Sequence, residues 1–83
     1  MNVRVIREMA AANTVEELEA MARAMLAARQ EEILSEPHVA DRFNSIVKAK
    51  AVRRAIDDGM STREAIRELG RMMRNVVGYD REE

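Results

Sequence analysis

The chain has 83 residues, 47% of them hydrophobic, and a net charge of −1. It has no cysteine and a single histidine, which excludes disulfides, thiolate metal sites and multi-histidine metal sites. We expect one domain over residues 1–83. A cysteine-free chain fits a reducing compartment, so we expect a cytoplasmic protein. No apolar run approaches the roughly 18 residues of a membrane span, so we expect no membrane partner.

The first half of the chain predicts two helices. Residues 2–12 repeat apolar residues at helical spacing, and Thr14 with Glu17 has the spacing of a capping box. The second helix should therefore start at about Val15 and run to about Leu34. Its expected apolar face, from which Arg29 also projects, comprises Leu18, Met21, Ala22, Met25, Leu26 and Ile33. A second face of this helix is small, with Ala20, Ala24, Ala27 and Ala28, and we interpret it mainly as a run of good helix formers.

A third helix should open at Ser35-Glu36-Pro37, because serine is a good cap and proline is tolerated in the first turn. It should run to Asp58 and end at Gly59. Its apolar residues fall into two groups on nearly opposite faces: Val39, Phe43, Ile46 and Val47, then Val52, Ala55 and Ile56. Either the helix kinks near residues 48–50, or it is central and packs against different neighbours at its two ends.

The last predicted helix begins after a turn at Gly59-Met60. Ser61 and Glu64 form a second capping box, and Gly78 stands where the helix would end. The apolar stripe of this helix is Ile66, Leu69, Met73 and Val76. A separate row is formed by four arginines, Arg63, Arg67, Arg71 and Arg74. Residues 79–83 should be a frayed acidic tail.

These elements predict an all-α fold of three to four helices, either a compact bundle or an interleaved homodimer. Leu, Ile, Val and Phe make up only 18 of the 83 residues, so the seven methionines must supply much of the core. A domain of this size is marginally stable alone, and self-association is the remedy left when disulfides and metals are excluded. The candidate apolar interface comprises Met21, Met25, Val52, Ile56, Met72 and Met73.

Charge is divided unevenly along the chain. Residues 1–41 hold four arginines against eight acidic residues, whereas residues 42–74 hold nine basic residues against four acidic ones. The arginine row therefore has three interpretations. It contacts phosphates, it docks on an acidic partner such as the acidic second helix of another copy, or it is a solvated flank paired as Glu64 with Arg67 and Glu68 with Arg71.

Residues 59–70 have a glycine-apolar-serine start, an Arg63-Glu64 pair and a closing Leu69-Gly70. This stretch resembles the first helix and turn of the resolvase-type helix-turn-helix. In that family the closing pair leads through a short turn to a recognition helix in the major groove. The resemblance implies a small DNA-binding regulator with a degenerate helix-turn-helix at residues 52–77. Apolar residues crowd the segment that follows Gly70, and the usual turn residues are missing there.

The sequence shows no set of residues that predicts catalysis. The only histidine, His38, lies two residues from Glu36, which is not the spacing of a di-metal helix site, and no glycine-rich phosphate loop is present. We therefore expect no catalytic residues, metal or cofactor. The favoured function is a non-enzymatic protein–protein interaction or regulatory accessory module that forms a homo-oligomer or binds another protein. The DNA-binding regulator is the alternative.

Overall fold

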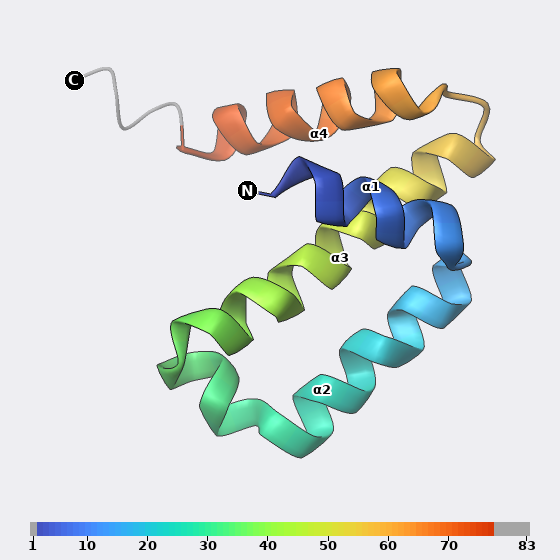
Figure 1. The fold of residues 1–83 in the computed structure, drawn as a ribbon. Helices are drawn as coiled ribbons and strands as arrows, with labels where there is room; N and C mark the ends of the chain where they lie inside the picture. Colours follow the sequence, from blue (N-terminus) through green and yellow to red (C-terminus); the bar gives the residue numbers. More distant parts are fainter. Residues whose placement is uncertain (1, 78–83) are drawn as a thin grey trace.

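The computed structural model describes residues 2–77, with side chains as far as Met73. The described chain contains four helices, α1 (Val3–Ala12), α2 (Val15–Ser35), α3 (Pro37–Asp57) and α4 (Thr62–Val77) (Figure 1). This confirms the predicted all-α fold. The predicted tail at residues 79–83 and the helix end at Gly78 lie outside the described residues. None of the described helices combines the length and apolar character that a membrane span requires.

The helix starts follow the capping signals in the sequence. The N–H of Glu17 donates to Thr14 Oγ1 at 3.1 Å, and the N–H of Thr14 donates to Glu17 Oε1 at 2.8 Å. Ser61 and Glu64 exchange the same two bonds, each at 3.1 Å. These pairs satisfy backbone donors that have no partner inside the helix. Both predicted capping boxes are therefore confirmed.

The junction between α2 and α3 differs from the prediction. The Ser35 hydroxyl donates back to the carbonyl of Glu31 at 2.8 Å, and Glu36 is the N-cap residue of α3 without a side-chain bond. The expected serine cap was therefore wrong, although Pro37 does occupy the first turn. The chain also bends within α2, where Arg29 leaves helical geometry at φ −135° and ψ 32°. This bend turns the last part of α2 towards the start of α3 (Figure 1).

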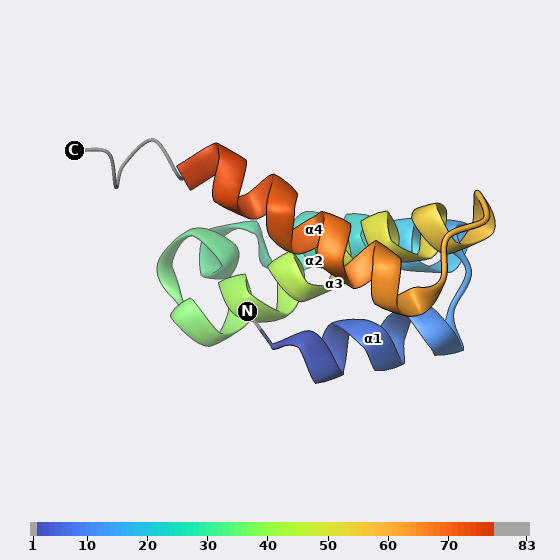
Figure 2. The ribbon, with the colours of Figure 1, turned by 90° about the horizontal axis from the view of Figure 1, so that it is seen from above.

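The third helix is the centre of the fold. It is uninterrupted over Pro37–Asp57 and packs against α1, α2 and α4, so the second of the two alternatives for its split apolar pattern is confirmed. The described helices form a flat body of 37 × 33 × 17 Å. Figure 1 shows α4 along one edge and α2 along the other, with α1 and α3 between them. In the view from above, α1 lies to one side of the other three helices (Figure 2).

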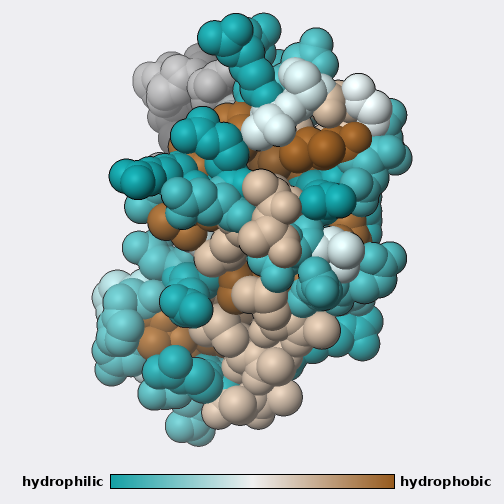
Figure 3. All heavy atoms as spheres, turned by 45° about the vertical axis from the view of Figure 1, so that its right-hand side comes forward, coloured by the Kyte–Doolittle hydropathy of each residue, from teal (hydrophilic) through white to brown (hydrophobic). Residues whose placement is uncertain are grey.

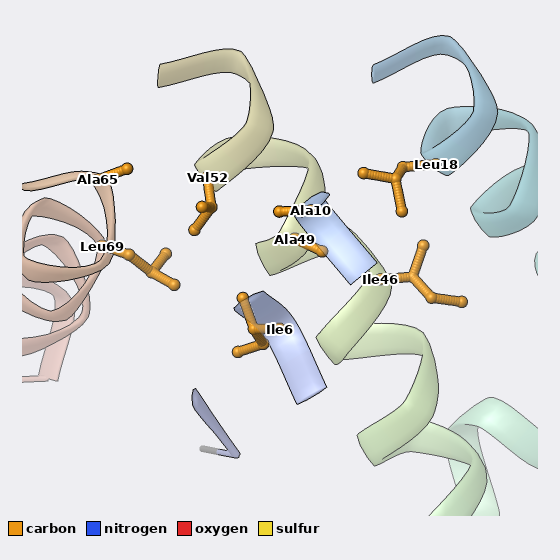
Figure 4. Close-up of a cluster of buried hydrophobic side chains, with 8 residues drawn as sticks. All are labelled: Ile6, Ala10, Leu18, Ile46, Ala49, Val52, Ala65 and Leu69. Atoms are coloured by element: carbon orange, nitrogen blue, oxygen red, sulfur yellow. The ribbon is translucent and has the colours of Figure 1, made fainter. Parts of the chain in front are cut away.

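The core is small and draws on every helix (Figure 4). Its buried residues are Ile6 and Ala10 of α1, Leu18 of α2, Ile46, Ala49 and Val52 of α3, and Ala65 and Leu69 of α4. Three of these eight are alanines, which lets the helices approach closely but buries little apolar area. Met9, Met21, Met25 and Met73 are among the side chains packed around this cluster, as the composition predicted.

Val52 corrects one part of the predicted interface. Its side chain is only 1% exposed and lies beside Leu69 and Ala65 of α4 (Figure 4). The apolar group that begins at Val52 is thus covered within one chain, because α4 folds back over the C-terminal half of α3. Val52 was therefore wrong as an interface residue. Ile56 is half-buried against the same core.

Candidate functional site

The outer face of α4 carries the arginine row, on the side of the helix opposite its buried residues. At about 100° per residue, the buried Ala65 and Leu69 define the inner side of the helix, and Arg67 and Arg71 project from the opposite side. The sequence predicted this division into an apolar stripe and an arginine row. It missed Ala65, which is 2% exposed, because a small side chain in a good helix former carries no clear burial signal.

The described arginines of the row differ in their partners. Nη2 of Arg71 donates to both carboxylate oxygens of Glu68, at 2.6 and 2.5 Å, as the i,i+3 spacing predicted. This hydrogen bond and the adjacent charge raise the pKa of Arg71 above its ordinary value. Arg67 does not receive its predicted partner, since the Glu64 carboxylate accepts from the Ser61 N–H. The Arg74 side chain lies outside the described residues.

The fold brings a further arginine to this surface. Arg7 of α1 lines the same hollow, of about 340 Å³, as Thr62, Arg63 and Ile66 of α4. Arg7, Arg63 and Arg67 are all exposed, and none of them forms an ion pair with another described residue. We call these three residues the arginine surface. Sequence reasoning missed Arg7 because only the packing of α1 against α4 places it there.

One exposed methionine, Met60, lies next to the arginine surface. Met60, before α4, is 39% exposed and Met72 is 47% exposed. A shallow hollow of about 460 Å³ is lined by Met60, Glu64, Arg67, Glu68 and Arg71. Of the predicted apolar interface, Met72 is the member that remains exposed. Met21, Met25 and Met73 are half-buried against the core and contribute to the fold instead.

The far edge of the molecule has the opposite character. The straight part of α2 exposes Ala20, Ala24, Ala27 and Ala28. Figure 3 shows a region of pale brown side chains over this lower part of the molecule. Glu16 and Glu31 lie on this edge, and neither forms an ion pair with another described residue. We call Glu16, Glu31 and the exposed alanines the acidic α2 face.

Two other carboxylates of α2 are paired. Glu19 Oε2 accepts from Arg23 at 2.7 Å, and Glu32 Oε1 accepts from Arg29 at 2.8 Å. The Arg23 hydrogen bond, with the positive charges of Arg23 and then Lys50, lowers the pKa of Glu19 below its ordinary value. The Arg29 hydrogen bond likewise lowers the pKa of Glu32.

The described residues do not assemble a metal site. Among them, no three His, Asp or Glu side chains gather closely enough to hold a metal ion. The Nδ1 of His38 lies 4.0 Å from Glu36 Oε1, and both side chains are exposed. The expectation that the chain is not an enzyme and uses no cofactor stays a prediction.

The predicted helix-turn-helix does not have the geometry that the resemblance implied. The structure contains a single α4 over Thr62–Val77, which continues through Gly70 without a turn. Residues 71–77 are therefore not a separate recognition helix. DNA binding itself remains a prediction, since an arginine surface can contact phosphates without that motif.

No family model, curated protein or solved structure matches this chain. The arginine surface attracts anionic groups, and the neighbouring Met60 offers a flexible apolar contact.

Proposed function

We propose that this chain is a small, non-enzymatic helical interaction module that acts by self-association, in a cytoplasmic setting. The carrying observation is the pair of surfaces at opposite edges of the body. One edge has three arginines without described carboxylate partners beside the exposed Met60, and the other has an acidic, alanine-lined helix. The thin core adds support, because a domain with so little buried apolar area gains stability from further burial.

Solution mass is the direct test of this proposal. Light scattering across about a hundredfold range of protein concentration should give a mass that rises above that of one 9.4 kDa chain. The rise should be smaller at high salt, since exposed charges are screened beyond about 8–10 Å at physiological ionic strength. A mass that stays at one chain throughout the range contradicts self-association and leaves another protein as the partner to be sought.

A DNA-binding regulator is the second candidate, and the arginine surface is the observation that favours it. Arg7 extends the basic patch of α4 across to α1, so that phosphates would meet three arginines from two helices. Fluorescence anisotropy with a labelled duplex tests this function. We expect binding that weakens steeply with salt and that Arg63→Glu removes. Absence of binding at low salt rules this candidate out.

A further inference from the structure

The two charged edges complement each other in chemistry. The arginine surface presents guanidinium groups that no described carboxylate neutralises, and the acidic α2 face presents Glu16 and Glu31 in the same condition. Guanidinium and carboxylate groups pair with good geometry across interfaces, where complementary charge also selects the partner. The positive charges of the arginine surface are thus complementary to the negative charges of the acidic α2 face on a second copy.

The two edges also offer apolar contact. Met60 is exposed at the α4 edge, and exposed alanines lie on the outer face of α2 around Arg23, which pairs with Glu19. Small residues allow helices to approach closely, and methionine adapts to fill the space between them. The described side chains of α4 span about 18 Å and the straight part of α2 about 21 Å at a rise of 1.5 Å per residue.

Within one chain the two edges cannot meet. Both α2 and α4 pack their inner sides against α3, and Figure 1 places them at opposite edges of the body. Their outer faces therefore point away from each other. A contact between them must join two different copies.

We infer that the outer face of α4, with the arginine surface, docks on the acidic α2 face of a second copy. This inference rests on the proposed function and names the partner and the contact. The contact is heterologous, because it joins two different patches. Two rigid copies cannot satisfy both patches at once when the patches face opposite ways, so association continues into a ring or an open chain instead of stopping at a two-fold dimer.

Single charge reversals at each edge test the contact. Arg67→Glu alters the α4 edge and Glu16→Arg alters the α2 edge, and both side chains are exposed, so neither change should unfold the chain. Each variant alone should self-associate at least about tenfold more weakly than the parent, since like charges then face each other. Arg42→Glu, an exposed reversal on α3 away from both edges, is the matched control and should associate as the parent does.

Mixing the two single variants gives the sharpest result. The Glu16→Arg chain keeps an intact α4 edge and the Arg67→Glu chain keeps an intact α2 edge, so these two edges should dock in an equimolar mixture. The two reversed edges also carry opposite charges, so the mixture should regain the association that each variant alone has lost, with the two variants alternating. Placing both reversals in one chain should restore self-association, because the exchanged charges again attract. Circular dichroism of each variant verifies that its helix content is unchanged.

Two outcomes overturn the inference. If the parent associates and both single variants associate equally well, copies meet through other faces; the docking contact is then wrong, while the proposed interaction function stands. If the parent stays at the mass of one chain at every concentration, both the contact and self-association are wrong. A mixture that associates no better than either variant alone also contradicts the contact, because the intact edges of the two variants would then have failed to dock.

Discussion

Arg53 should anchor the first helix. Its Nη1 donates to the carbonyl of Ala10 in the last turn of α1 at 3.0 Å, and its Nε donates to Asp57 at 3.0 Å. The two bonded segments are 43 residues apart in the chain. A carbonyl near a helix C-terminus lacks an intrahelical partner and carries partial negative charge, so a guanidinium is a favourable partner for it. Replacing Arg53 by methionine keeps most of the aliphatic stem and removes this bond.

The expected cost follows from the burial of the guanidinium. Hydrogen bonds to charged groups contribute about 1.5–3 kcal/mol, and a cation at a helix C-terminus about 0.3–1 kcal/mol. The Arg53 side chain is 29% exposed, so water replaces part of the lost bond. We therefore expect Arg53→Met to lower the free energy of unfolding by about 1–2 kcal/mol. For a domain of this size that corresponds to a fall in Tm of about 4–16 °C.

Urea unfolding followed by far-ultraviolet circular dichroism measures this loss. Protein concentration must be the same for all variants, because self-association adds to apparent stability. The neighbouring Arg54 is exposed, so Arg54→Met is the matched control and should change stability by less than about 0.5 kcal/mol. If the Arg53 and Arg54 variants unfold at the same urea concentration, the bond to Ala10 does not hold α1, and the reasoning is refuted.

Three further measurements test the core, the caps and the charges. Ile46→Ala, at a side chain 1% exposed, should lower the free energy of unfolding by about 3 kcal/mol. Leu34→Ala, at a side chain 81% exposed, is its control and should change this free energy by less than about 0.5 kcal/mol. Equal effects in urea unfolding would contradict the assigned core. Ser61→Ala should cost about 1 kcal/mol through loss of the capping bond, and Ser35→Ala much less, with thermal unfolding distinguishing them. Because Arg23 lowers the pKa of Glu19 in the folded chain, its stabilising effect is present above the ordinary value of 4.5 and is lost as the pH falls through the lower folded pKa. An acid titration should therefore show a smaller loss of stability for Glu19→Gln than for the parent, and identical titrations would contradict the assignment.

The local features of this fold could be predicted from the sequence. Helix starts depend on hydrogen bonds between residues three apart, so Thr14 with Glu17 and Ser61 with Glu64 identify them without knowledge of the rest of the chain. Helical periodicity likewise identified the inner stripe of α4 through Leu69. The pairing of Glu68 with Arg71 belongs to the same class, since the two residues are neighbours on one helix.

Two local features, the hydrogen bond of Ser35 and the bend at Arg29, could not be predicted from the sequence. Serine is a common N-cap residue, so Ser35 could have capped α3. Its hydroxyl can also donate to the carbonyl one turn back, and in the structure it donates to Glu31. The bend at Arg29 follows neither a proline nor a glycine. Only Glu36 separates α2 from α3, and the bend lets the chain reverse direction over this short connection. The need to reverse comes from the packing of α2 against α3.

By itself, the sequence determined the helices, their caps and the amphipathic face of α4, because these depend on residues within one or two turns of each other. Only the tertiary structure decided that Val52 is covered by α4, that Arg7 joins Arg63 and that Arg53 bonds to Ala10. These contacts join residues far apart in the chain, and their partners depend on which helices pack together. The arginine surface and the acidic α2 face acquire a functional interpretation from their positions at opposite edges of the folded body.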